Sequence, residues 1–251
     1  MAGRRATALA TRRDVIRLVG AAGTAILSPW RASAAALQGP PAQTAMDLDH
    51  LMWGVPDLDA GIALLEAKTG VRAVVGGVHP KRGTRNALLS LGTGQYLEIL
   101  ATDPAQKGVR EGRVAQLERL AAPRMFTWAA ATRDIEGLER KVRAAGIETS
   151  GVVAGARSKP DGNVLRWKTF SVGGHDGDVV PFVIEWDRAS RHPSLDSPGG
   201  CALRELRLEH PDPATVNRLL EALGLRVRAS RGPRPGIAAL LSTPKGDLLL
   251  T

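Results

Sequence analysis

Apolar and polar residues alternate along the first part of the chain in the pattern of several short strands around one helix. Strands are predicted where apolar residues alternate with polar ones or run unbroken between turn residues. A helix is predicted where this pattern changes after Pro56, and Gly70 ends it. The result is a β-α-β-β-β unit over about residues 46–103, with strands at Leu48–Val55, Val71–Val75, Asn86–Leu91 and Gln95–Leu100 and a helix at Ala60–Thr69.

The same order of elements returns later in the chain. Met125–Ala131 has the pattern of a strand, and Leu138–Ala145 has that of a helix, which Gly146 closes. Further strands are predicted at Val164–Phe170 and Val179–Trp186. A second unit is therefore expected over about residues 125–187, joined to the first by a charged helix at residues 109–120.

A third copy begins near Cys201. Leu203–Pro213 aligns without gaps with Leu48–Leu58, and one helix and three strand-like stretches follow it. Repetition of this length outweighs any single motif in deciding the fold. The predicted fold class is α+β with repeated β-α-β-β-β units, two of them forming a domain at residues 46–198 and a third unit occupying residues 199–251.

Residues 1–34 resemble a twin-arginine signal peptide and residues 35–45 a linker. Arg12 and Arg13 precede a weakly apolar stretch at Leu18–Leu27, which is shorter than the roughly 20 residues a membrane span needs. The segment Ala32-Ser33-Ala34 is a small-x-small cleavage pattern. We expect export to the periplasm or beyond the cell without a stable membrane anchor, the alternatives being a basic N-terminal arm or an uncleaved anchor.

The net charge and the number of cysteines argue against a nucleic-acid partner and against an intrachain disulfide. The chain has 251 residues and a net charge of +9, but the six arginines and single aspartate of residues 1–34 place +5 of it in the expected signal segment. The remaining surface is ordinarily basic and carries no groove-reading motif, so nucleic acid is not expected as a partner. Cys201 is the only cysteine, which excludes an intrachain disulfide.

Three ionisable residues within apolar strands supply candidate chemistry. Glu98 lies in Gln95–Leu100 and Glu185 in Pro181–Trp186. An inward carboxylate requires a metal ion, an arginine or a proton, because an unpaired buried charge is costly. His50, on the first strand, could face the same side of a curled sheet as Glu98. The alternatives are a core histidine bonded to the backbone and glutamates that face solvent.

Residues on loops and a later strand extend the candidate site. His79 lies in a glycine-rich loop, where function concentrates, and it could be a general base, a further ligand or a loop-stabilising residue. Arg85 and Asn86 could bind substrate or hold that loop. Trp167, between Arg166 and Lys168, is a candidate substrate contact, although a solvated strand face fits the same pattern.

These motifs together resemble the glyoxalase-like domain family of the vicinal oxygen chelate superfamily. The resemblance implies that two units pair so that their sheets curl into one cup, with metal ligands on the first and fourth strands of each unit. It assigns His50, Glu98 and Glu185 to a divalent ion (Zn, Mn, Fe, Ni or Mg), with only Thr127 near the fourth position, and it gives His79 or Glu185 a catalytic role. The matching pieces are Leu48-Asp49-His50, Gly76–Pro80 with Gly83–Asn86, Tyr96-Leu97-Glu98, and Pro181–Trp186 with His192-Pro193-Ser194.

The resemblance implies a metal-dependent lyase or isomerase that acts on a small oxygenated compound through enolate or enediolate stabilisation. Two alternatives remain open. An extradiol-type dioxygenase needs two histidines and one glutamate at iron, so His79 would have to join His50 and Glu98. A metal-free protein that binds or sequesters a small molecule needs no ligand set. The expected partners are a small-molecule substrate and a second copy of the chain in a homodimer.

Overall fold

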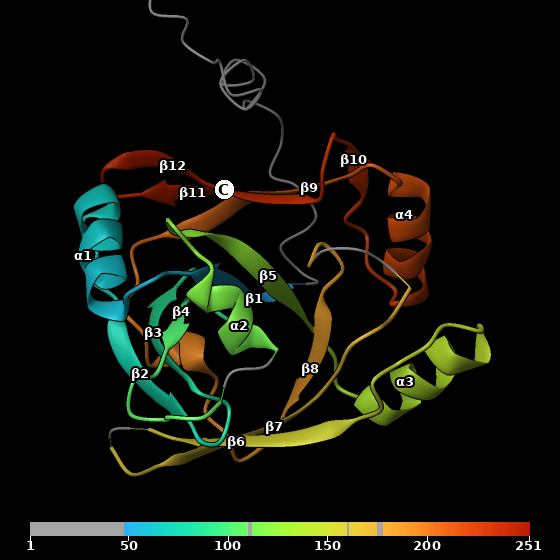
Figure 1. Ribbon diagram of the computed structural model, residues 1–251, viewed down its shortest axis with the longest axis horizontal. Helices are drawn as coiled ribbons and strands as arrows, with labels where there is room; N and C mark the ends of the chain where they lie inside the picture. The colour runs from blue at the N-terminus through green and yellow to red at the C-terminus, as the bar shows by residue number, and fades with distance from the viewer. Residues whose placement is uncertain (1–47, 110–111, 160, 175–177) are drawn as a thin grey trace, which may run out of the picture. The chain divides into compact units, whose positions relative to one another are not determined.

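An eight-stranded mixed sheet dominates the computed structural model, which describes residues 48–109, 112–159, 161–174 and 178–251. The strand order is β2-β3-β4-β1-β5-β8-β7-β6, so each half of the sheet comes from one predicted unit. The signal peptide and linker expected over residues 1–45 lie outside the described residues. The fold class expected from the sequence, repeated units pairing into a curled mixed sheet, is confirmed (Figure 1).

The first unit contributes four strands and one helix. Helix α1 begins after Asp57, whose carboxylate accepts a hydrogen bond from the Ala60 N–H at 2.8 Å, and it ends at Gly70, whose φ of 80° favours a residue without a side chain. The last strand returns beside the first and pairs with it in parallel. The elements are β1 (Leu48–Gly54), α1 (Leu58–Thr69), β2 (Val74–His79), β3 (Thr84–Ser90) and β4 (Tyr96–Thr102).

The second unit repeats this arrangement. Its last strand again pairs in parallel with its first, and Asp134 caps its helix by accepting from the Gly137 N–H at 2.9 Å. One strand, β6, was not identified from the sequence. The elements are β5 (Arg124–Ala131), α3 (Ile135–Ala144), β6 (Val153–Ser158), β7 (Val164–Phe170) and β8 (Phe182–Trp186). The connecting helix α2 spans Arg113–Glu118, a shorter range than predicted.

The two halves meet at β1 and β5, which pair antiparallel in the middle of the sheet. The sheet curls until its edge strands β2 and β6 contact each other. The register of β1 on β5 shifts between Leu48 and His50, which makes Asp49 the extra residue of a β-bulge. A bulge redirects the side chains around it, and this one lies directly before His50, the candidate site residue of β1.

The C-terminal unit has the predicted order of elements but a different pairing. Its first strand, β9, pairs in parallel with β10 and antiparallel with β11, in a separate sheet of order β10-β9-β11-β12. The helix α4 therefore returns the chain directly beside β9, and the last strand lies at the far edge as a hairpin partner of β11. The elements are β9 (Ala202–His210), α4 (Pro213–Ala222), β10 (Ala229–Arg231), β11 (Gly236–Thr243) and β12 (Gly246–Leu250).

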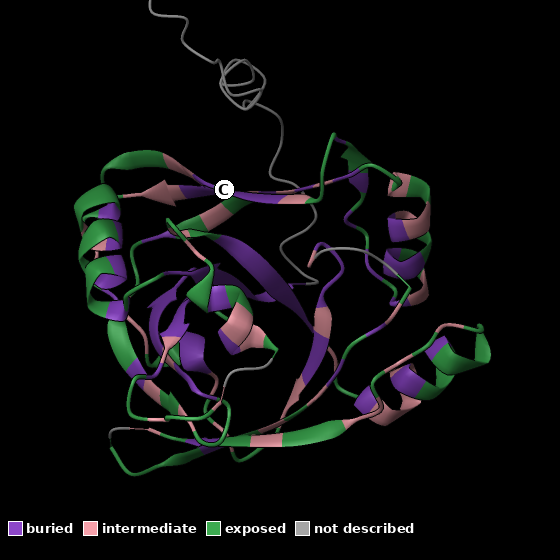
Figure 2. Ribbon diagram, in the orientation of Figure 1, coloured by how far each residue is buried: buried purple, intermediate pink, exposed green. Residues whose placement is uncertain are grey.

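One large apolar cluster joins the two sheets and the helices. It includes Leu51 and Leu97 of the large sheet, Leu65 of α1, Leu208 of β9 and Leu220 of α4, all nearly without solvent exposure. Figure 2 shows the helices with a buried face toward the sheets and an exposed face outward. The third unit therefore packs on the first two. None of the described helices has the length and apolar character that crossing a membrane requires.

Candidate functional site

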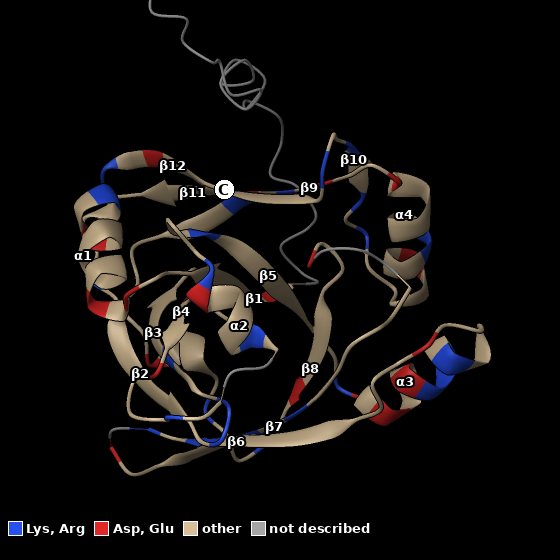
Figure 3. Ribbon diagram, viewed as in Figure 1, with Lys and Arg blue, Asp and Glu red and all other residues tan. Residues whose placement is uncertain are grey.

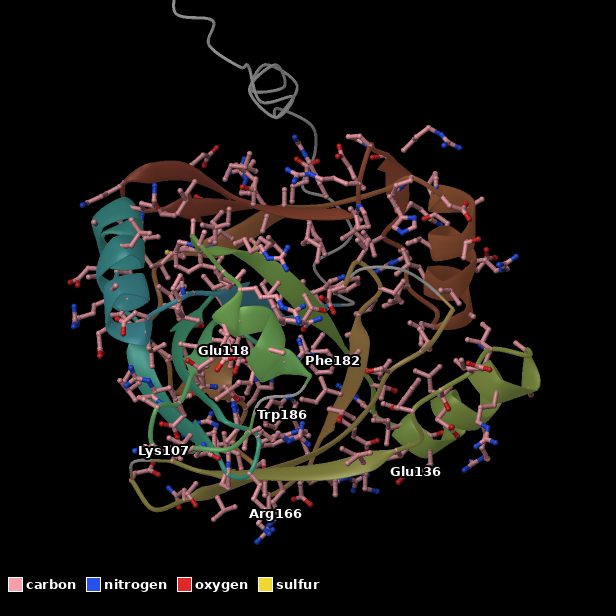
Figure 4. The ribbon with its side chains drawn as sticks, viewed as in Figure 1. Lys107, Glu118, Glu136, Arg166, Phe182 and Trp186 are labelled. Carbon is pink, nitrogen blue, oxygen red and sulfur yellow. The ribbon has the colours of Figure 1, made fainter. Side chains whose placement is uncertain are left out.

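A cavity of about 560 Å³ opens inside the curled large sheet. A volume of this size suits a small organic molecule. Because strand side chains alternate between faces, alternate residues of β1, β3, β4, β7 and β8 line the cavity. Figure 4 shows two of these residues, Phe182 and Trp186, on the inner side of β8. The strand residues that line it are His50, Met52, His79, Thr84, Asn86, Tyr96, Glu98, Leu100, Arg157, Trp167, Thr169, Phe182, Ile184 and Trp186.

Glu98 is the central polar group of this cavity. Its side chain is 6% exposed, and its Oε1 atom accepts a hydrogen bond from the Asn86 Nδ2 atom at 2.6 Å. The Nε2 atom of His50 lies 3.6 Å from Oε2 and that of His79 lies 3.8 Å from Oε1. The structure thus brings together four of the predicted site residues: His50, His79, Asn86 and Glu98.

Asp49 fixes the orientation of His50. Because Asp49 is the bulged residue of β1, its Oδ1 atom reaches the Nδ1 atom of its neighbour at 2.6 Å. Its Oδ2 atom accepts from the Trp186 Nε1 atom at 3.0 Å and lies 3.1 Å from the His192 Nε2 atom. With Nδ1 bonded to a carboxylate, the ring of His50 is turned so that its Nε2 atom faces Glu98.

The pKa of Asp49 reports this network. Burial raises the pKa, but hydrogen bonds from His192 and His50 and the charges of the two imidazoles lower it further, to about 2. Asp49 is therefore a fixed anion at neutral pH and does not exchange protons in the working range. Sequence reasoning missed it, although an aspartate directly before the candidate histidine in an apolar strand was a usable signal.

His79 is held neutral on the other side of Glu98. Its Nδ1 atom lies 2.9 Å from the Thr84 Oγ1 atom, and its ring meets that of Trp167 edge-on with centroids 6.5 Å apart. Burial lowers its pKa below the usual 6.5, while the charge of Glu98 opposes the shift. A neutral imidazole beside a carboxylate can accept or relay a proton at neutral pH.

The structure does not bring Glu185 to the site. In β8 the cavity is lined by Phe182, Ile184 and Trp186, so Glu185 faces the opposite side of the sheet. There its Oε2 atom accepts a hydrogen bond from the Ile135 N–H at 2.7 Å, at the N-terminus of α3. The expectation that Glu185 acts as a ligand or catalyst is corrected: it stabilises unpaired donors and the positive end of a helix.

Arg85 is also outside the cavity, whereas Asn86 and Trp167 line it. Neighbouring residues of a strand face opposite sides, and Arg85 extends toward α1, where its Nη2 atom lies 3.7 Å from Asp59 Oδ2 and 3.9 Å from Asp57 Oδ2. Arg85 therefore holds the start of the first helix rather than a substrate.

The residues that face the cavity do not fit the expected divalent metal centre. In the described ranges, no group of three or more His, Cys, Asp or Glu side chains could hold a metal ion. Glu185 is turned away, Glu98 Oε1 is occupied by the Asn86 amide, and Thr127 donates to the Asp178 carbonyl at 3.2 Å.

Comparisons with known proteins agree with this architecture. A family model described as a glyoxalase-like domain matches residues 48–224. A hypothetical protein from Staphylococcus aureus has a similar structure, with a TM-score of 0.58 and 17% identity over 80% of this chain and 83% of that one. Methylmalonyl-CoA epimerase from Mycobacterium tuberculosis aligns with a TM-score of 0.40 and 21% identity over 61% and 95% of the two chains. A comparison with curated proteins found no match.

Proposed function

The chain belongs to the glyoxalase-like domain family, and we propose that it is an enzyme that moves a proton at a carbon next to a carbonyl group. The reaction class is isomerase or lyase, with an enolate as the intermediate. The observation that carries the proposal is the buried carboxylate of Glu98 between two imidazole Nε2 atoms, at 3.6 and 3.8 Å, inside a cavity sized for a small molecule.

Glu98 acts as the general base. Its carboxylate removes the proton from carbon, and the electron pair of the C–H bond moves into the carbonyl to form the enolate. The atom of His50 that faces Glu98 in this step is Nε2, since Nδ1 is bonded to Asp49. The proton then returns to a different carbon or face in an isomerase, or the enolate expels a leaving group in a lyase. A positioned base contributes about 10²–10⁴-fold to such a step.

The surroundings of Glu98 support this role. Asn86 keeps one carboxylate oxygen in place through a 2.6 Å hydrogen bond, and the ring of Tyr96 stacks on His50 with centroids 4.6 Å apart. Burial raises the pKa of Tyr96 well above 10.0, so its phenol stays protonated. Fixed groups of this kind reduce the reorganisation that the reaction requires.

Exchange of carbon-bound hydrogen in D₂O tests the proposal. A panel of small 2-oxo and 3-oxo acids, ketones and hydroxyketones is incubated with the protein, and deuterium at the carbon next to the carbonyl is followed by NMR. The wild type is expected to accelerate exchange of at least one member, and Glu98→Gln to lower that rate at least 10²-fold. Glu185→Gln is the matched control, because it removes a strand carboxylate outside the cavity.

Two results would overturn the proposal: no exchange with any member of the panel, or equal rates for wild type and Glu98→Gln. The first, together with tight binding of a small molecule, would assign the metal-free binding role. Stoichiometric Zn, Mn, Fe, Ni or Mg that is lost in His50→Ala would instead restore the metal-dependent lyase, and oxygen consumption with catechols the dioxygenase.

We further propose that the protein is exported by the twin-arginine route. The support is the sequence of residues 1–34, with Arg12 and Arg13 before an apolar stretch and a small-x-small cleavage pattern. In a bacterium with this export system, cell fractionation should find the wild type outside the cytoplasm and the double variant Arg12→Lys, Arg13→Lys inside it. Equal distribution of both would contradict the proposal.

A further inference from the structure

The wall of the cavity carries an excess of positive charge. Among the described residues that line it are four cationic side chains, Lys81, Arg82, Arg113 and Arg157, and a single carboxylate, Glu98. Lys81 and Arg82 are exposed in the turn between β2 and β3, where the ribbon in Figure 3 has the blue colour of Lys and Arg. Charges of one sign that line a cleft raise the local concentration of oppositely charged ligands.

Arg157 is a buried cation without a partner for one of its donors. The residue is 4% exposed, and its Nη1 atom has no hydrogen-bond partner within the described part of the chain. A Cβ atom at Gly77 would lie 3.1 Å from this Nη1 atom, so the glycine leaves the space that the guanidinium fills. A buried charged donor left unpaired is costly, which points to a partner that a ligand supplies.

Arg113 repeats this pattern from another element. It is the first residue of α2, and its guanidinium carbon lies 5.3 Å from the Phe126 ring centroid and 5.8 Å from that of Phe182. Its Nη1 atom is also buried with no hydrogen-bond partner among the described residues. Stacking on aromatic rings leaves the N–H groups at the edge of a guanidinium available to an anion.

We propose that the cavity binds an organic anion that carries a carboxylate group and a carbonyl group. The carboxylate group pairs with Arg157 and Arg113, and the part of the molecule that carries the carbonyl group extends to Glu98. The inference rests on the proposed function in that it places the substrate in the same site. Guanidinium groups bind carboxylates through two parallel N–H···O bonds. The Glu98 carboxylate does not pair with Arg157 or with Arg113. Among the described residues, neither arginine forms an ion pair with it within 4.0 Å.

A pair of probes that differ only in charge tests the inference. Acetoacetate carries a carboxylate and an acidic carbon next to a carbonyl, and acetoacetamide is its neutral counterpart of nearly the same shape. Calorimetric titration of the wild-type protein at neutral pH is expected to give at least tenfold tighter binding for acetoacetate.

Substitutions of single arginines test which residue produces the preference for acetoacetate over acetoacetamide. Arg157→Met should reduce the preference for acetoacetate over acetoacetamide to about one, and Arg113→Met should reduce it in part. Arg166→Met is the matched control, since it removes an exposed arginine of β7, which points away from the sheet in Figure 4; the preference should stay unchanged. Arg157→Lys, which keeps the charge but loses the planar pair of donors, guards against a variant that fails to fold and should keep a reduced preference.

Equal binding of acetoacetate and acetoacetamide to the wild type would overturn the inference. So would an unchanged preference in a folded Arg157→Met protein. This test differs from that of the proposed function: Glu98→Gln should lose hydrogen exchange yet keep the preference for the carboxylate. Charge-selective binding without any exchange would overturn the enzymatic role alone, and exchange without charge selectivity would overturn the carboxylate assignment alone.

Discussion

Replacing Asp49 by asparagine tests how the protein positions His50. The aspartate is acceptor to three donors, the His50, Trp186 and His192 side chains, from a position whose side chain is 2% exposed. Asparagine has nearly the same shape, but it lacks the charge and turns an N–H group toward one of the donors. A buried donor is then left without an acceptor.

The magnitude follows from the pKa of Asp49. Its value falls from 3.8 in the unfolded chain to about 2 in the folded protein, which corresponds to about 2.4 kcal/mol of stability at neutral pH. Because the folded pKa is depressed, this contribution is complete above about pH 4 and is lost as pH falls toward 2. About half of it, roughly 1.3 kcal/mol, remains at about pH 3.

The assay is denaturant unfolding of wild type and Asp49→Asn at about pH 6 and about pH 3. The variant should be less stable by about 2.4 kcal/mol at the higher pH and by about half as much at the lower. Asp59→Asn, which alters a side chain that is 77% exposed, should change stability by less than about 0.5 kcal/mol at both. A difference for Asp49→Asn that is independent of pH, or below about 0.5 kcal/mol at pH 6, would refute the reasoning.

Two further predictions concern a residue outside the cavity and a residue that lines it. Glu185→Ala should lower the free energy of unfolding by about 1 kcal/mol, because it removes the acceptor of the Ile135 N–H at the start of α3, and ligand binding measured by calorimetry should stay unchanged; a loss of binding without a loss of stability would return Glu185 to the site. For His79, burial lowers the pKa below 6.5. Below pH 6.5 the histidine is therefore protonated more readily in the unfolded chain than in the folded protein, and stability falls as the pH drops. His79→Gln should therefore flatten the decline in unfolding free energy between about pH 6.5 and about pH 5, and an unchanged slope would contradict the assignment.

The hydrophobic pattern was sufficient to predict every strand of the large sheet except β6. Each half needs a strand, a helix and further strands in order, and caps such as Asp57 and Gly70 are local signals whose geometry the structure confirms. His50 and Glu98 could be placed on one face because β1 and β4 are neighbours within a single unit. The caps depend on contacts close in sequence, whereas the pairing of β1 with β4 depends on the order of elements within one unit.

At two positions, Glu185 and Arg85, the sequence did not predict on which face of the sheet the side chain lies. Glu185 was predicted within an apolar strand and Arg85 on a loop, yet both lie on strands and each is one residue away from the cavity face. A shift of one residue reverses the side of a strand, and bulges such as those at Asp49 and between Val75 and Gly77 change the alternation without a clear signal. The pairing of β9 with β10 was equally hidden, because partners in a sheet are chosen by packing and not by element order.

The sequence by itself predicted the repeated units and their helices from local periodicity, and it left His50 and Glu98 as candidates that could share one face. Only the tertiary structure decided which polar groups share one cavity. It placed His79 and Asn86 beside Glu98, turned Glu185 to the start of α3, and brought Arg113 and Arg157, each with one unpaired donor, to the lining of the same cavity. These groups come from strands and a helix far apart in the chain, so their convergence depends on how the sheet curls, which no local pattern encodes.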